Sequence, residues 1–247
     1  MTYCLGMLLD EGLIMMADTR TNAGVDNFST YRKLVSLCDG PDRAIHVASA
    51  GNLSASQTAI GLIREGLPGA VDYDQTLGGA PSMFRAAQLI GEALHSANRS
   101  IGDALESSAG AGATLLMGGR IGDDPPSLYL IYEAGNFIEC QSEVPFFQIG
   151  ETKYGRPILD RVIRPSTPLA EAVKIGFLSF DSCMRSNLGV ARPIDVVVMP
   201  RDPAAPVLSL RIEKDDPYFD ALSNRWSELL HQATRAIPDP PFMQAHG

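Results

Sequence analysis

Short apolar runs separated by turn residues recur along the chain and are typical of β-strands. At the N-terminus, two such runs flank the turn Asp10-Glu11-Gly12, which predicts a β-hairpin. A polar loop is expected to follow from Asp18 to Asn27. The full set of predicted strands covers residues 3–9, 13–17, 33–38, 43–50, 113–117, 128–132, 137–140, 146–149, 194–199 and 207–212.

Between these strands, apolar residues recur at the spacing of three and four that marks one face of a helix. The pattern predicts helices over about 53–63, 82–105, 154–162, 168–184 and 218–236. Strands in blocks with helices in pairs are typical of an α+β layered sandwich rather than of alternating βαβ units. We expect one domain over residues 1–247, with a Pro-rich flexible tail over about 237–247.

Composition and charge narrow the function classes. The chain has 247 residues, of which 45% are hydrophobic, so it can bury one large core. Lys and Arg number 20 against 29 Asp and Glu, and this net charge of −9 argues against nucleic acid as a partner. The longest uncharged stretch, residues 44–63, is rich in Ser, Asn and Gln, so no membrane span is expected.

Cysteine and histidine usage points to a cytoplasmic protein without a metal site. No C-x-x-C pair occurs, and widely spaced cysteines in a chain of this length read as buried hydrophobes in a reducing compartment. No basic region precedes the apolar start, so we expect no signal peptide. The histidines show no zinc-ligand spacing, and they lie at His46, His95, His231 and His246.

Common catalytic signatures are missing. There is no G-x-S-x-G elbow and no G-K-[ST] phosphate loop, and Gly110-Ala111-Gly112 does not continue as a dinucleotide-binding motif. The chain has only four histidines, which makes a Ser-His-Asp triad less favoured. If the chain is a hydrolase, it must activate its nucleophile without histidine.

Thr2 is one candidate for such a nucleophile. Removal of Met1 would leave a free α-amine beside the Thr2 hydroxyl, and the pKa of an α-amine is about 7.7–8.0. The amine can then accept the hydroxyl proton, so nucleophile and base lie in one residue. Many chains begin with Met-Thr, however, and the position alone is weak evidence.

The surrounding residues strengthen this hypothesis. The opening Thr2-Tyr3-Cys4-Leu5-Gly6, the run over residues 12–20 and Lys33 resemble the start of proteasome-type β-subunits, which are N-terminal-nucleophile (Ntn) hydrolases. Residues 47–51, 147–150, 181–182 and 193–198 are similar to later segments of that family, so the resemblance covers the chain from Thr2 to about Ile212. Within the family, Thr-Tyr-Cys, residues 18–24 and residues 184–187 look most like Anbu, the ancestral β-subunit, a bacterial homologue of the proteasome.

The resemblance implies a four-layer αββα sandwich and a set of catalytic roles. Thr2 would attack a peptide carbonyl, and the positive charge of Lys33 would favour the alkoxide-like form of the Thr2 hydroxyl. Asp18 would hold and balance Lys33, and Asp181 would orient the Thr2 end of the site. The backbone N–H near Ala48 would stabilise the oxyanion. The mechanism needs no metal or organic cofactor.

The same resemblance implies how a substrate binds. The loop of Arg20, Thr21 and Asn22 would pair with an extended peptide by strand addition. His46 or its neighbour Ile45 would shape the pocket for the residue before the cleaved bond. We also expect a homo-oligomer, as a ring or related helical assembly, whose ATP-dependent unfoldase, if any, the sequence does not identify.

Alternatives remain open at this point. Taken alone, Asp18 and Lys33 are compatible with a structural ion pair, and His46 with a satisfied core residue. Glu151 and Met184 occupy places where many family members have serine. This departure motivates two other hypotheses: an Ntn amidohydrolase for a small or specialised amide, and a catalytically weak self-assembling scaffold.

Overall fold

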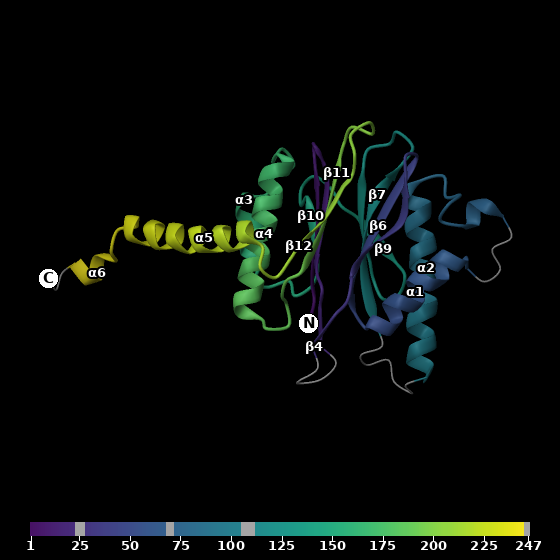
Figure 1. The fold of residues 1–247 in the computed structure, drawn as a ribbon, viewed down its shortest axis with the longest axis horizontal. Coiled ribbons are helices and arrows are strands. Elements are labelled where there is room, and N and C mark those ends of the chain that lie inside the picture. Colours follow the sequence, from purple (N-terminus) through teal and green to yellow (C-terminus); the bar gives the residue numbers. More distant parts are fainter. Residues whose placement is uncertain (23–27, 68–71, 105–111, 245–247) are drawn as a thin grey trace. The chain divides into compact units, whose positions relative to one another are not determined.

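A computed structural model describes residues 1–22, 28–67, 72–104 and 112–244. Residue contacts group the chain into two compact units, Met1–Glu213 and Lys214–Gly247. In the first unit, two stacked sheets lie between two layers of helices (Figure 1). This arrangement confirms the α+β class and is the αββα sandwich that the resemblance implies.

The first sheet is antiparallel and has the strand order β10-β1-β2-β11-β12. Its two central strands are almost entirely buried, because one face contacts a helix layer and the other contacts the second sheet. This explains why they read as continuous apolar runs rather than as alternating patterns. The strands are β1 (Tyr3–Leu9), β2 (Gly12–Asp18), β10 (Phe146–Gly150), β11 (Ile194–Pro200) and β12 (Leu208–Ile212).

The second sheet is also antiparallel, in the order β5-β6-β7-β8-β9. We expected a strand to end before Gly118, but β7 continues to Ile121. A Cβ at Gly118 would lie 2.7 Å from Leu13 Cδ2 and from Met15 Sδ of the facing sheet, so glycine permits close sheet packing there. The strands are β5 (Leu34–Gly40), β6 (Arg43–Gly51), β7 (Ala113–Ile121), β8 (Ser127–Ile131) and β9 (Phe137–Glu139).

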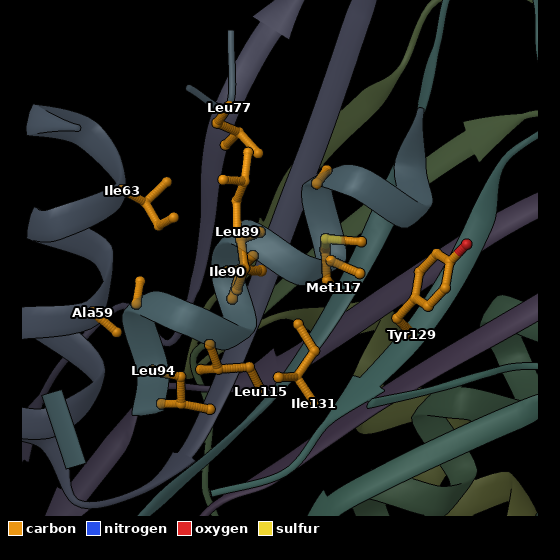
Figure 2. Close-up of a cluster of buried hydrophobic side chains, with 14 of the residues drawn as sticks. Ala59, Ile63, Leu77, Leu89, Ile90, Leu94, Leu115, Met117, Tyr129 and Ile131 are labelled. Atoms are coloured by element: carbon orange, nitrogen blue, oxygen red, sulfur yellow. The ribbon is translucent and has the colours of Figure 1, made fainter. Parts of the chain in front are cut away.

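Helices α1 (Leu53–Glu65) and α2 (Met83–Ala104) cover the outer face of the second sheet. Asn52 caps α1, because its Oδ1 accepts a hydrogen bond from the Ala55 backbone N–H. The helices and the sheet enclose a cluster of buried apolar side chains (Figure 2). A short 3₁₀ helix, Tyr73–Gln75, lies in the connection between α1 and α2.

Helix α4 (Leu169–Ser186), paired with α3 (Arg156–Val162), covers the outer face of the first sheet. Helix α4 comes close to β2 at Gly176, where an added Cβ would lie 2.7 Å from Met16 Sδ. Both helices were predicted, although α3 begins two residues later than expected, after the bend at Gly155.

Part of the expected polar loop is a small two-stranded sheet. Strand β3 (Arg20–Asn22) pairs antiparallel with β4 (Phe28–Thr30). Residues 23–27 of the expected loop lie outside the described residues, as does residue 105 at the end of the helix predicted over 82–105.

The second unit contains α5 (Pro217–Ala236) and the short helix α6 (Pro241–Gln244). Asp216 caps α5 by accepting a hydrogen bond from the Phe219 backbone N–H at 2.8 Å, and Pro217 follows as the first helical residue. The expectation of one domain with a tail over about 237–247 stays a prediction. Among the described residues, no helix has both the length and the apolar character needed to cross a bilayer.

Candidate active site

Asp18 lies at the end of β2 and is completely buried. One carboxylate oxygen, Oδ1, accepts hydrogen bonds from Lys33 Nζ at 2.7 Å and from the Tyr3 backbone N–H at 2.9 Å. The other, Oδ2, accepts one from the Arg20 backbone N–H at 3.1 Å. Burial raises the pKa of the Asp18 carboxyl, and the Lys33 ammonium and the backbone donors oppose this effect.

Lys33 precedes β5 and is 4% exposed. Its carbonyl accepts a hydrogen bond from the Ser49 backbone N–H at 3.1 Å, which ties it to the neighbouring strand. Its ammonium also donates to the Arg20 carbonyl at 2.6 Å. An ammonium has three donors, and Asp18 and Arg20 account for two of them. Among the described residues, no further hydrogen bond of this ammonium accompanies these two.

Thr2 directly precedes β1, and the next residue, Tyr3, is hydrogen-bonded through its backbone N–H to Asp18 of the Asp18–Lys33 pair. The Thr2 carbonyl, in the same peptide bond, accepts from the Glu151 backbone N–H at 2.6 Å. Gly150 has φ of +83° and comes so close to the Thr2 carbonyl that a side chain there would collide with it. The structure therefore brings Thr2, Asp18 and Lys33 to one place.

Ala48 lies in β6, opposite Leu34 of β5 and Leu116 of β7. Because Leu34 directly follows Lys33, this register places Ala48 beside the start of β5. Its role as the backbone donor for an oxyanion stays a prediction.

The predicted substrate-binding residues Arg20, Thr21 and Asn22 form β3. In the described part of the chain, β3 pairs only with β4, which leaves its second edge without a strand. Arg20 Nη1 also donates to the Leu188 carbonyl at 2.7 Å, so this strand contacts the segment after α4. Peptide binding along the free edge stays a prediction.

His46 lies in β6 and is 2% exposed. It lines a cavity of about 360 Å³ between β5 and the β11–β12 edge, together with Leu34, Ser36, Asp195 and Arg211. Its Nε2 is buried and has no hydrogen-bond partner among the described residues. Burial lowers the pKa of His46, and the Asp39 carboxylate opposes this shift. Thr2, Asp18 and Lys33 are not among the residues that line this cavity, and the role of His46 in a substrate pocket stays a prediction.

Asp181 lies in the C-terminal half of α4 and is 5% exposed. Its Oδ2 accepts a hydrogen bond from Arg185 Nε at 2.9 Å, one helical turn along. The contact with Arg185 offers a structural reason for the carboxylate, and its proposed effect on Thr2 stays a prediction.

Side chains bonded to Glu151 and Tyr3, the two residues that adjoin the Thr2 carbonyl, are not among the candidates that sequence reasoning selected. Asn187 donates from Nδ2 to Glu151 Oε2 at 2.9 Å, and Tyr3 Oη is hydrogen-bonded to Ser179 Oγ at 2.7 Å. Gln148 Nε2 donates to the same hydroxyl at 2.7 Å. The only sequence signal was that Glu151 replaces a serine of the family and that Asn187 lies in the stretch similar to Anbu.

A metal site would need at least three His, Cys, Asp or Glu side chains close together in the part of the chain that the structure describes. There, no three His, Cys, Asp or Glu side chains gather in a way that could hold an ion. The acidic groups around Thr2 are bonded instead to the Lys33 ammonium, to the Asn187 amide and to backbone N–H groups.

Comparisons with known proteins gave matches among solved structures. No protein-family model and no curated protein matched. A mutant of Anbu (Gly-1) from Hyphomicrobium sp. strain MC1 is 45% identical, with a TM-score of 0.89 over 97% of this chain and 99% of that chain. Anbu (ancestral β-subunit) from Yersinia bercovieri is 39% identical, with a TM-score of 0.86 over 96% and 98% of the two chains.

A third structure, described as the helical assembly of the Anbu complex from Pseudomonas aeruginosa, is 38% identical, with a TM-score of 0.90. It covers 99% of this chain and 100% of that chain. Identity at this level over nearly the full length shows common ancestry as well as a common fold. The chain belongs to the Anbu family of ancestral proteasome β-subunits.

Proposed function

We propose that this chain is a proteasome-type threonine peptidase that hydrolyses peptide bonds through Thr2 after removal of Met1. The observation that carries the proposal is the buried Lys33–Asp18 pair, 2.7 Å apart and one peptide bond from Thr2. Burial of an ion pair costs desolvation energy, so such a pair needs an explanation. A catalytic site that requires a charged ammonium beside a hydroxyl would explain it.

The proposed reaction uses one residue as nucleophile and base. The α-amine of Thr2 accepts its hydroxyl proton while Oγ1 forms a bond to the carbonyl carbon. A backbone N–H near Ala48 stabilises the oxyanion. The protonated amine gives its proton to the leaving nitrogen, the C–N bond breaks, and an ester remains on Thr2. Water then hydrolyses this ester with the amine again as base.

We further propose a cytoplasmic homo-oligomer acting on peptide or protein substrates. All four cysteines are free, which suits a reducing compartment. A related structure is described as a helical assembly, and we expect a ring or helical homo-oligomer for this chain. Partners that would deliver substrates, such as an unfoldase, are not part of the proposal.

Intact mass spectrometry followed by labelling tests the proposal. The purified protein should lack Met1, and incubation with a β-lactone should add one reagent mass to Thr2 by acylation of its hydroxyl. The variant Thr2→Ala should take up no label and lose peptide hydrolysis, whereas Thr2→Ser should keep part of both.

The outcomes separate the alternatives. Labelling of Thr2 with turnover of small amides but not of peptides would favour the amidohydrolase. A chain that has lost Met1, takes up no label and behaves like Thr2→Ala in every hydrolytic assay would favour the scaffold and contradict the proposal.

A further inference from the structure

Both polar groups of the peptide bond between Thr2 and Tyr3 form hydrogen bonds, one with the Asp18 side chain and one with the Glu151 backbone. Asp18 Oδ1 accepts its N–H at 2.9 Å, and the backbone N–H of Glu151 donates to its carbonyl at 2.6 Å. Two hydrogen bonds on opposite sides fix the plane of this peptide group. The position of the Thr2 Cα, which carries the nitrogen and the Cβ with its hydroxyl, follows from that plane.

The Glu151 side chain connects this anchor to a second segment. Glu151 is 6% exposed, its Oε1 accepts from the Lys153 backbone N–H at 2.9 Å, and its Oε2 accepts from Asn187 Nδ2 at 2.9 Å. A buried carboxylate is unfavourable unless hydrogen bonds compensate the lost hydration. Here two uncharged donors do so.

The Asn187 side chain continues the connection to the first residue. Its Oδ1 accepts from the Gly189 backbone N–H at 2.9 Å. Gly189 lies against Met1, since a Cβ on Gly189 would be 2.5 Å from Met1 Cβ. Segments 150–153 and 187–189 thus flank the first two residues. After removal of Met1, the hydrogen bond from the Glu151 N–H to the Thr2 carbonyl remains. The Glu151–Asn187 hydrogen bond joins the two segments across 36 positions of sequence.

We infer that Glu151 and Asn187 are positioning residues that hold Thr2 in the orientation for attack. The inference rests on the proposed function, in which Thr2 is the nucleophile. Once Met1 is removed, Thr2 is a chain end, and a chain end keeps its orientation only through contacts of this kind. A misplacement of about 1 Å at a reacting group can lower a rate by a factor of about 10².

The pair can be reversed without changing the net charge. In Glu151→Gln, the single amide oxygen cannot accept from both donors, and its NH₂ faces another NH₂. In Asn187→Asp, two carboxylates face each other across the former 2.9 Å contact. In the double variant, Gln at 151 donates to Asp at 187, while both connections to the backbone N–H groups of Lys153 and Gly189 can persist.

The test measures β-lactone labelling of Thr2, together with kcat and KM for a peptide substrate, in the full chain. Each single variant should lower the labelling rate and kcat by about 10- to 100-fold with KM changed less than about threefold, since attack geometry rather than binding is affected. The double variant should return to within about threefold of the wild type. Asp160→Asn is the matched control, because Asp160 pairs with Arg156 on the surface of α3, and it should leave the rates unchanged.

Several results would overturn the inference. Single variants that label at the wild-type rate would do so, as would a folded double variant slower than either single one. If a single variant fails to fold, the double variant decides, because restored folding and labelling support the pair and slow labelling contradicts it. An unlabelled wild type would instead refute the proposed function and this inference with it, whereas a labelled wild type with unaffected variants refutes the inference alone.

Discussion

At the scale of single residues, Asp18 and Lys33 depend on each other. Both side chains are buried, and their opposite charges compensate each other across a contact of 2.7 Å. Removal of one partner of such a pair costs about 3–5 kcal/mol, because the other charge stays buried and unpaired. The fold is therefore stable only while both partners of the pair are present.

We predict that Lys33→Ala abolishes turnover and lowers the free energy of unfolding by about 3–5 kcal/mol. Urea denaturation and peptide hydrolysis measure the two effects. The double variant Asp18→Asn/Lys33→Ala should recover part of the stability, since no buried charge remains, but no activity. Lys174→Ala, an exposed residue of α4, is the control and should change stability by less than about 0.5 kcal/mol. Full activity of a folded Lys33→Ala would contradict the assigned role.

His46 gives a prediction about pH. Burial lowers its pKa in the folded chain, while in the unfolded chain the pKa is about 6.5. Below about pH 6.5 the unfolded chain therefore binds a proton that the folded chain resists, so acid lowers stability. His46→Leu removes this pH-dependent loss of stability. When the pH falls from 7.5 to 5.5, the unfolding free energy of the variant minus that of the wild type should therefore increase. A difference that is the same at both pH values would contradict the prediction.

At the scale of elements, two glycines in helices have opposite roles. Gly176 lets α4 approach β2, because a larger residue would press on Met16, whereas a Cβ on Gly61 of α1 would meet nothing within 4 Å. The same residue type is thus a packing requirement in one helix and a weakness in the other.

We predict that Gly176→Leu lowers the unfolding free energy by about 1–3 kcal/mol through overpacking. Gly61→Ala should raise it by about 0.5–1 kcal/mol, because alanine loses less conformational freedom in a helix. Urea denaturation of both variants checks the pair. Equal effects of the two substitutions would show that the close approach at Gly176 is not what the glycine is needed for.

At the scale of the whole molecule, α5 carries apolar side chains that the single chain leaves in solvent. Tyr218, Leu229 and Leu230 are 55%, 40% and 48% exposed, and Phe219 is the buried residue of this helix in the single chain. Exposed apolar surface of this kind favours association with another copy in the proposed homo-oligomer.

We predict that Leu229→Asp/Leu230→Asp shifts the proposed assembly toward smaller species, because charged residues resist burial in an interface. Light scattering during size-exclusion chromatography measures the mass. Glu228→Gln, which changes an exposed residue of the same helix, should leave the mass unchanged. An unaltered mass in the aspartate variant would exclude these leucines from the interface.

The sequence by itself determined the order and type of the strands of the two large sheets and of the longer helices, because hydrophobic periodicity and turn residues are local properties. Thr2 was a candidate from its position after Met1, and the resemblance to a family added Asp18 and Lys33. Local patterns failed where a distant segment decided the outcome. Gly118 reads as a strand end, but the facing Leu13 and Met15 make glycine the residue that lets β7 continue.

Only the tertiary structure decided how the candidate site is built. The hydrogen bonds from Tyr3 to Asp18 and from Asn187 to Glu151 join residues 15 and 36 positions apart. No periodicity encodes such contacts, since they arise when strands and loops meet at one end of two stacked sheets. The sequence thus identifies candidate residues by their chemical type, and the packing of the layers determines which of these residues lie close together.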